Sequence, residues 1–540
     1  MFNKTCFKVT TLCMLLSQIL LADVFEENEQ RNRQRDIFEN LNKDPSTNTE
    51  IFKAPEFSPL QPSKDEQCFD IKNITVLGAT LISKSKIDSI TARYLDKCTS
   101  LTDLKNLTNE INALYVDKGY ITSQAYLSAQ NIAEGNVTLQ TIEGKIKNIL
   151  PQESYIKSAS VNKAEDFLNI RDIEILIENA NRLPSNHASM KLNPAESVGY
   201  TDILIENSPT KRFGGYLGVD NFGGEKTGRA QISGKLNIDN PVGINDQINI
   251  LYNTSDKHYK DENSIGKSYE YSFPLGRTTL SLSQRNNRFK QNVRTGNNVF
   301  LSEGETRTYT FDTQYRIYHD QKHRLNTGVS ISNYRTKNYF ADAYLESSSY
   351  RLSKLSLSGD YSYQVPGFYT FVNLAYVRGV DLFNNYHSTA LDDEYEIYNL
   401  SLSLMKDFAP FRYSLSAYSQ FTNDSLFGSD KISIGGVYSV RGFNKEGLSG
   451  NSGYYVRNEL SYNLAFDFLN GLGNSYFIAL DGGAIKSDDD SFGGQLLGYA
   501  AGAKLQNKYF ETTVSYSMPA YKKDVTKTGN FFGVTFKTKF

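Results

Sequence analysis

The alternation of apolar and polar residues has a period of two over the last three fifths of the chain. From Tyr398 to Leu404, apolar side chains occupy every second position, with Asn or Ser between them, and residues 354–358 and 411–417 repeat the pattern. Strands of about ten residues with one apolar and one polar face are typical of a barrel whose outer wall contacts lipid. The pattern predicts such a barrel over residues 211–540.

A soluble β-sandwich also alternates, so the connections must distinguish the two folds. Roughly sixteen strands can be counted, an even number as bacterial barrels require. Short connections are expected near 274–277, 319–322, 364–367, 408–410 and 506–507. Long polar loops are expected at 286–304, 335–350, 379–395 and 422–453. Short and long connections alternate, which favours a barrel with periplasmic turns at one rim and external loops at the other.

Two small α+β units precede the barrel. Residues 67–144 and 145–210 each follow the order strand, helix, helix, strand, strand. In the first unit, Ser100 and Asp103 form a capping box that begins the second helix. In the second unit, the first helix is expected near 159–167. Neither unit contains a convincing catalytic set of residues.

The first 22 residues are typical of a signal peptide. Lys4 and Lys8 supply the positive start, and residues 9–21 are mostly apolar. The alternative of a transmembrane anchor is weaker, because the apolar stretch is short and is interrupted by Thr, Ser and Gln. A lipoprotein reading of Cys13 lacks the small residues that should precede it. An exported chain is therefore expected.

A polar helix on a tether is expected after the signal peptide. Residues 23–43 are rich in Glu, Gln, Asn and Arg and have only a thin apolar stripe. Residues 44–66 contain four prolines among Ser, Thr and Asn, so this segment is predicted to be an extended linker.

Export also bears on the cysteines. Cleavage of the signal peptide removes Cys6 and Cys13 and leaves Cys68 and Cys98. Two cysteines in an exported chain most often pair, although two free buried thiols are the alternative. We therefore expect a disulfide within residues 67–144.

Composition narrows the function further. The net charge of −2 and the mean hydropathy of −0.47 imply neither nucleic acid nor an anionic surface as a partner. The chain has 36 Tyr and 32 Phe but no Trp, and such aromatic content is expected at a membrane–water boundary. After the signal peptide, no window approaches 18 consecutive apolar residues, which excludes a helical membrane protein.

Few residues suggest a catalytic or metal-binding site. His319 and His323 flank a short turn, but no acidic or cysteine partner completes a metal site. The acidic run at 488–490 is better explained by a solvated loop than by calcium. No order of Ser, His and Asp suggests a nucleophile. We expect neither a catalytic residue nor a metal nor a cofactor.

The longest predicted loop contains the sequence Val440-Arg441-Gly442-Phe443. A lone Arg in a surface loop is usually solvated. This loop is long and glycine-rich enough to fold into a lumen, where an unpaired guanidinium would be costly. Asp481, two residues before Gly483, has the lumen-facing parity of its strand and could form a bidentate pair with Arg441.

These residues resemble a known family. Segments 68–71, 97–98, 117–123 and 143–145 look like a first POTRA domain, and segments 168–174, 181–186 and 202–205 look like a second. With the Val440–Phe443 loop and the Asp481-Gly482-Gly483 strand, they resemble two-partner secretion translocators of the TpsB family, within the POTRA-barrel superfamily. These are the outer-membrane partners of haemolysin- and filamentous-haemagglutinin-type exoproteins.

The resemblance implies a mainly β fold: a 16-stranded transmembrane antiparallel β-barrel, two βααββ POTRA domains and an N-terminal helix that can lie in the pore. It also implies that Arg441 reaches into the lumen and pairs with Asp481. Tyr is common in the family where Phe443 stands here. The expected protein is a monomeric transporter without enzymatic activity, whose partners are outer-membrane lipid and the N-terminal secretion domain of an exoprotein.

Three other functions remain as alternatives. They are a passive porin, an outer-membrane hydrolase and a barrel-assembly factor of the same superfamily. The paired small domains and the tethered helix disfavour a porin, and the lack of a nucleophile disfavours a hydrolase. An assembly factor usually carries a different number of POTRA domains.

Overall fold

The computed structural model describes part of the chain in detail. The described residues are 27, 29–42, 57–61, 66–255, 262–295, 297–465, 472–489, 491–525 and 528–540. The predicted signal peptide, 1–22, lies outside them, as does most of the predicted linker, 44–66.

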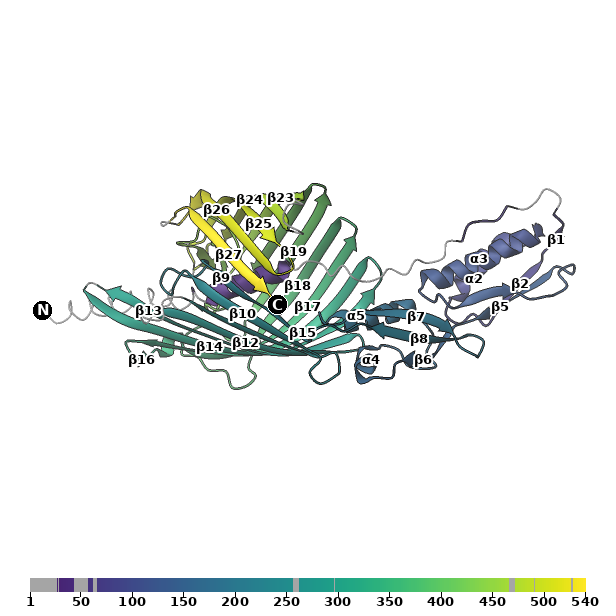
Figure 1. Cartoon of the computed structure of the whole chain (residues 1–540), viewed down its shortest axis with the longest axis horizontal. Coiled ribbons are helices and arrows are strands. Elements are labelled where there is room, and N and C mark those ends of the chain that lie inside the picture. Colours follow the sequence, from purple (N-terminus) through teal and green to yellow (C-terminus); the bar gives the residue numbers. More distant parts are fainter. Residues whose placement is uncertain are drawn as a thin grey trace.

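A closed antiparallel barrel forms the body of the molecule (Figure 1). Within the described residues its sixteen main strands follow one another around the wall in chain order, which confirms the predicted fold class. The strands are β9 (Phe213–Asp220), β10 (Gln231–Asp239), β11 (Gln247–Ser255), β12 (Asn263–Leu275), β13 (Thr278–Thr295), β14 (Asn298–His319), β15 (His323–Phe340), β17 (Tyr350–Val365), β18 (Phe368–Val380), β19 (Glu396–Phe408), β20 (Phe411–Phe421), β23 (Gly453–Ala465), β24 (Gly473–Ile485), β25 (Gly494–Gln506), β26 (Phe510–Lys523) and β27 (Phe531–Lys539). A short strand, β16 (Ala343–Tyr344), folds back onto β15.

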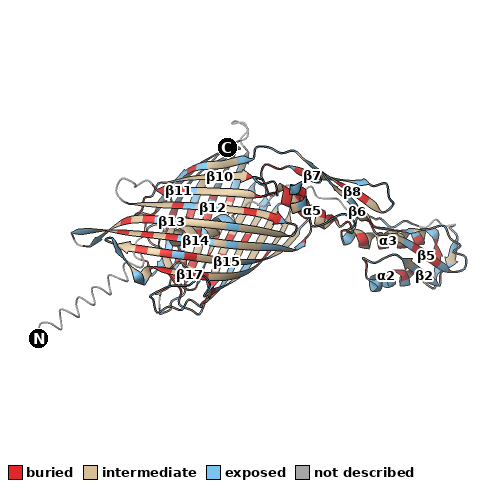
Figure 2. Ribbon diagram, turned by 90° about the horizontal axis from the view of Figure 1, so that it is seen from below, coloured by how far each residue is buried: buried red, intermediate tan, exposed pale blue. Residues whose placement is uncertain are grey.

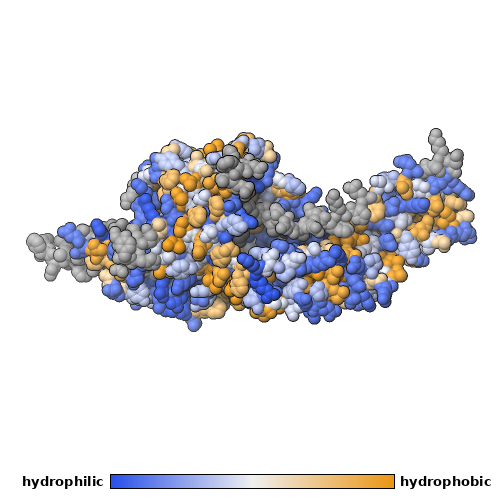
Figure 3. Space-filling model, viewed as in Figure 1, coloured by the Kyte–Doolittle hydropathy of each residue, from blue (hydrophilic) through white to orange (hydrophobic). Residues whose placement is uncertain are grey.

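The outer wall of the barrel is apolar. Large side chains that alternate along the strands are exposed there, including Leu217, Val219, Leu282, Phe311, Leu374, Leu400, Ile478 and Phe532. The space-filling view shows apolar side chains gathered over the barrel strands (Figure 3). Since exposed apolar area of this extent is unfavourable in water, the surface is suited to lipid.

Two of the long loops expected from the sequence are mostly strand. β13 and β14 pair with each other over 286–295 and 298–304, and β15 continues to Phe340. The prediction was wrong because these residues are polar, yet opposite charges face each other across the ladder. Arg288 lies opposite Glu305, and Lys290 lies opposite Glu303. Such cross-strand pairs stabilise a hairpin that does not need an apolar face.

The first small domain has a three-stranded sheet covered by helices. β5 (Asn136–Ile142) lies between β2 (Asn73–Leu77) and β4 (Gln124–Leu127). The helices are α2 (Lys84–Thr91), a 3₁₀ turn (Ala92–Tyr94) and α3 (Leu101–Asp117), and β1 (Cys68–Asp70) pairs with β3 (Cys98–Ser100). Ser100 and Asp103 form the predicted capping box of α3. Leu104, Leu107 and Ile111 of α3 are fully buried against the sheet.

The second small domain repeats this sheet. β8 (Tyr200–Asn207) lies between β6 (Lys145–Leu150) and β7 (Ala188–Pro194), with α4 (Ser154–Ala159) and α5 (Ile170–Asn181) packed against it. The helix expected near 159–167 is wrong, because α4 ends where that segment begins. Glu165, with φ of 74°, and Asp166 instead bond through their backbones to Ile146 of β6.

The N-terminal helix lies inside the barrel. Residues 29–41 are helical, and Figure 1 shows this helix enclosed by the barrel strands. Among the described residues, no helix is long and apolar enough to cross a membrane.

Candidate functional site

The loop between β20 and β23 folds into the barrel. It contains a small hairpin, β21 (Ile432–Ile434) paired with β22 (Leu448–Gly450). Its apolar side chains are buried against the inner wall and the helix, in a cluster of Ile432, Ile434, Val440 and Phe443 with Leu41, Tyr418, Tyr455, Ile485 and Leu496. We call residues 422–452 the inward loop.

Arg441, at the tip of the inward loop, meets two carboxylates of the wall. Its Nε and Nη2 donate to the two oxygens of Asp481 on β24 at 2.6 and 2.9 Å. Its backbone N–H donates to Asp481 at 3.2 Å, and Nη1 donates to Glu459 of β23 at 2.9 Å. Asp481 is fully buried and Arg441 is 7% exposed, so the pair is shielded from water. A bidentate contact of this kind fixes both position and orientation.

The sequence indicated Asp481 but not Glu459. Lys504 of β25 donates to the other oxygen of Glu459 at 2.5 Å, so two cations and two carboxylates alternate in one network. Each buried charge therefore has a partner of opposite sign, which limits the cost of desolvation. Glu459 is two residues from Arg457 on β23, so the two side chains lie on the same face of the strand. This alternation is the sequence feature that could have indicated Glu459.

Glycines permit the loop tip to approach the wall. Gly442 has φ of 95°, and a Cβ there would lie 2.4 Å from the backbone carbon of Met518. A Cβ on Gly483 would lie 3.2 Å from Cγ2 of Val440 and 2.7 Å from a backbone oxygen. A Cβ on Gly498 would lie 1.8 Å from the carbonyl oxygen of Arg441, a close approach that the sequence did not indicate.

One face of the N-terminal helix contacts the inward loop. Gln30 donates to Ser449 at 2.8 Å, and Gln34 donates to the backbone and side-chain oxygens of Ser433 at 2.8 and 2.9 Å. Arg33, between them, donates to the carbonyl oxygens of Asp430 and Lys431 at 2.5 and 3.1 Å. These residues have the i, i+3, i+4 spacing of one helical face. The helix and the loop therefore pack as one unit.

The helix also contacts the wall directly. Asp36 forms an ion pair with Arg285 of β13. The guanidinium of Arg457 lies 4.6 Å from the ring centre of Phe38 and donates to the carbonyl of Val437 at 2.6 Å.

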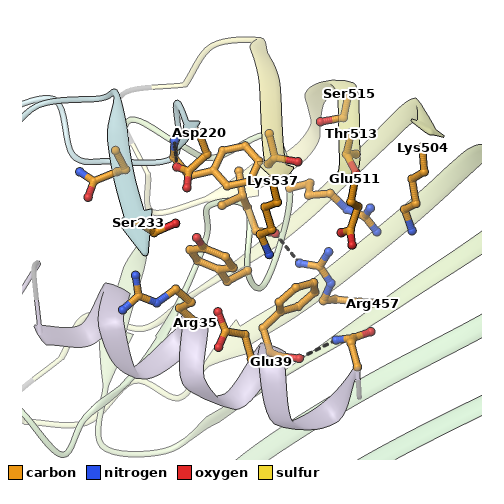
Figure 4. Close-up of a pocket in the computed structure, with 18 of the residues that line it drawn as sticks. Arg35, Glu39, Asp220, Ser233, Arg457, Lys504, Glu511, Thr513, Ser515 and Lys537 are labelled. Atoms are coloured by element: carbon orange, nitrogen blue, oxygen red, sulfur yellow. Dashed lines mark hydrogen bonds between the residues drawn. The ribbon is translucent and has the colours of Figure 1, made fainter. Parts of the chain in front are cut away.

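A polar cavity remains beside the helix. It has a volume of about 620 Å³. Figure 4 shows Arg35 and Glu39 of the helix pointing into it, with Lys504, Glu511 and Lys537 on the strands across from them. Side chains of both charges, together with Ser and Thr, line the cavity. Such a lining suits water or a polar polypeptide segment better than an apolar ligand.

The second small domain is docked on the rim where the strands are joined by short turns. Asn179 of α5 donates to the carbonyl of Gly276, in the β12–β13 turn, at 2.7 Å. Arg182 donates to Ser272 at 2.9 Å, and Ser158 donates to the carbonyl of Ile244 at 2.8 Å. Figure 2 shows α5 densely buried at this junction.

Glu178 of α5 is the ionic centre of that interface. It accepts from Arg324 of β15 at 2.7 Å and pairs with Arg316 of β14, while His319 lies 3.6 Å away. Burial alone would raise the pKa of Glu178, but His319, Arg324 and Arg316 outweigh it and hold that pKa below its ordinary value. His319, which the sequence analysis assigned to a turn, thus lies in the interface.

In the first small domain, Cys68 and Cys98 are joined by a disulfide, with their Cα atoms 5.2 Å apart. It links the ends of β1 and β3 and closes the segment that contains β2 and α2. Among the described residues, no group of three His, Cys, Asp or Glu is placed to hold a metal ion.

In both small domains, an asparagine of a helix forms hydrogen bonds with the backbone of an edge strand of the sheet. Asn112 of α3 caps both backbone groups of Ala125 on β4, at 2.6 and 3.3 Å. Asn181 of α5 caps both backbone groups of Ala188 on β7, at 2.6 and 2.8 Å. These groups point away from the sheet, so by strand alternation those of Met190 and Leu192 on β7 do as well.

A transmembrane barrel with an occupied lumen and two small α+β domains on its turn rim defines the class of outer-membrane transporters with POTRA domains. The family model described as haemolysin secretion/activation protein ShlB/FhaC/HecB matches residues 199–505. A ShlB-type POTRA domain matches 69–144, and a second POTRA domain matches 138–194. The chain belongs to this family of two-partner secretion outer-membrane transporters, which are not enzymes.

Relatives are similar over most of their length. The outer membrane transporter CdiB of Dickeya dadantii is 28% identical, over 92% of this chain and 90% of its own. The hemolysin transporter protein ShlB of Serratia marcescens is 26% identical, over 84% of this chain and 85% of its own. The structure of CdiB from Escherichia coli superposes with a TM-score of 0.83 at 25% identity, covering 96% of this chain and 98% of that one.

Proposed function

We propose that this chain passes one secreted partner protein, unfolded, from the periplasm through its barrel to the cell surface. The observation that supports this most is the content of the lumen. It holds a polar helix and a folded-back loop, and hydrogen bonds and ion pairs join the helix to the loop and both of them to the wall. A lumen that holds a helix and a folded-back loop of the same chain suits a polypeptide better than a small solute.

The proposed arrangement places the POTRA domains, 67–144 and 145–210, in the periplasm after removal of residues 1–22. The docking of the second domain on the short-turn rim supports this, because short turns are typical of the periplasmic side. A client leaving these domains would reach the lumen without crossing lipid.

The client would be recognised as an added β-strand. The outward backbone groups of Met190 and Leu192 on β7 offer an unpaired edge next to the capped Ala188. An extended chain that pairs there would gain main-chain hydrogen bonds with little demand on its sequence. The choice of one client would then depend on the side chains along this edge.

A gene deletion in the source bacterium would test the proposal. Loss of the chain should remove one large protein from the culture fluid and cell surface, as measured by mass spectrometry, while the other outer-membrane barrels keep their amounts. Re-expression of the full chain should restore that protein. A general fall in outer-membrane barrels would instead support an assembly factor and overturn the export proposal.

A further inference from the structure

A second buried carboxylate holds the inward loop, on a part of the wall away from Arg441. Asp430 is 3% exposed. One carboxylate oxygen accepts from the hydroxyls of Tyr334 and Tyr395 at 2.5 and 2.6 Å, and the other forms an ion pair with Lys354. Tyr334 is on β15, Lys354 is on β17, and Tyr395 immediately precedes β19. We call this set the Asp430 anchor.

The two attachments of the loop lie on different sectors of the barrel. Strands β18, β19 and β20 separate β17 from β23 along the wall. The inward loop therefore spans the lumen, with Arg441 held by β23 and β24 and Asp430 held near β15 and β17. Release of Arg441 alone would leave the loop attached to the other side.

The N-terminal helix joins this anchor through the backbone of the same residue. The carbonyl oxygen of Asp430 accepts from Arg33 at 2.5 Å and from Gln420 of β20 at 2.8 Å. The side-chain oxygen of Gln420 in turn accepts from Arg33 at 2.7 Å. The carboxylate of Asp430 thus accepts from residues of the wall, and its carbonyl oxygen accepts from the helix.

We propose that Asp430 is a positioning residue that couples the N-terminal helix to the barrel wall, so that the helix leaves the lumen only when the Asp430 anchor rearranges. Lys354 and the two tyrosines fix the carboxylate, which fixes the peptide group that Arg33 binds. Loss of the carboxylate removes the ion pair with Lys354 and loosens that peptide group. This coupling deepens the proposed export function, but it is measurable without any client.

Single-channel recording of the full chain in planar bilayers tests the coupling. Asp430→Asn should raise the frequency of open events by about tenfold or more, equivalent to about 1.4 kcal/mol. Asp424→Asn is the matched control. That acid lies in the same loop, accepts from the backbone N–H of Glu396 at 2.7 Å and, among the described residues, forms no ion pair with the helix. Its open frequency should equal that of the unmodified chain.

Deletion of residues 23–43 separates coupling from a general weakening of the loop. In that background Asp430→Asn should add nothing, because the partner through which it acts is gone. An equal, additive rise in the deleted chain would overturn the proposal, and so would an unchanged open frequency in the full chain. Should Asp430→Asn fail to insert, the double substitution Tyr334→Phe with Tyr395→Phe removes two donors and keeps both rings. It should raise the open frequency in the same helix-dependent way, and no rise overturns the proposal.

Discussion

All three nitrogens of the Arg441 guanidinium donate to carboxylates of the barrel wall. Removal of either partner leaves the other charge buried, which costs about 3–5 kcal/mol where burial is deep. Arg441→Ala and Asp481→Ala should each reduce secretion at least about tenfold while the barrel still inserts and resists heat in detergent. Arg441→Lys should rescue poorly, since an ammonium cannot make the two-pronged contact.

The double substitution tests whether the two residues act through one contact. It should be little worse than either single change, because residues in one network are non-additive. Removal of the exposed pair between Arg412 and Asp407, at the β19–β20 turn, is the control and should not affect secretion. Additive defects at 441 and 481 would give each residue a separate role.

The disulfide of the first POTRA domain makes a simple chemical prediction. Thiol labelling of denatured, unreduced mature protein should detect no free cysteine. Cys68→Ser should lower the stability of that domain by about 3.5–4 kcal/mol in the chain-entropy estimate, measured by its rate of proteolysis. Two labelled thiols in the unmodified protein would contradict the pairing.

Parity and charge made Asp481 one candidate partner of Arg441, because a buried guanidinium requires a carboxylate, and the resemblance to the family singled it out. This reasoning did not single out Asp430 or Glu459. The carboxylate of Asp430 meets hydroxyls 35 and 96 residues away, and Glu459 meets Lys504 at a separation of 45 residues. Which of many lumen-facing residues a folded-back loop meets depends on its three-dimensional path, and period-two patterning contains no information about that path.

At the scale of the elements, the N-terminal helix occupies part of the lumen. Deletion of residues 23–43 should raise single-channel conductance, because the helix fills cross-section that water would then occupy, while secretion largely persists. The comparison is with the intact chain in the same bilayers. An unchanged conductance would show that the helix does not occupy the pore in the membrane.

The edge strand β7 allows a backbone test of client capture. Met190→Pro removes an outward backbone N–H that the client would pair with, and should therefore reduce secretion. Met190→Ala removes the side chain but keeps the N–H, so secretion should be retained. Equal effects of the two substitutions would point to the side chain and to the domain core it packs against.

The elements best predicted from sequence are the strands whose alternation of apolar and polar residues is imposed by their surroundings. Lipid on one side and water on the other impose strict alternation, so the barrel and its strand number were accessible. Near the connection between them, β13 and β14 have polar residues on both faces and are stabilised by pairs of opposite charges across the two strands. No apolar face marks them, so their sequence resembled a loop.

At the scale of the whole molecule, acid should weaken the docking of the second POTRA domain. Glu178 has a lowered pKa, so its contribution is fully present above its unfolded value of 4.5 and is lost as pH falls through the folded pKa. Thermal unfolding from neutral pH to about pH 3 should show this loss, centred below about pH 4.5.

Glu178→Gln should be less stable at neutral pH and should lack this part of the acid response. Burial raises the pKa of neighbouring Glu174, which acts in the opposite direction. Because Glu174 is present in both chains, the difference between the variant and the unmodified chain reports Glu178 together with His319, the titratable group 3.6 Å from it. Identical acid profiles would remove Glu178 from the interface energetics.

The barrel closes where β27 pairs with β9, with Phe536 opposite Val219. This ladder covers Thr535–Lys539, with a further backbone exchange between Phe540 and Gly215, whereas β13 and β14 pair over the whole of Thr278–Thr295. The first and last strands are also the most distant in sequence, so their meeting bears the greatest loop-closure entropy. The slow step in assembly is therefore expected at this seam, which forms only after β27 has been synthesised and exported. A chain truncated within β27 should retain a folded POTRA pair and yet never become a closed cylinder.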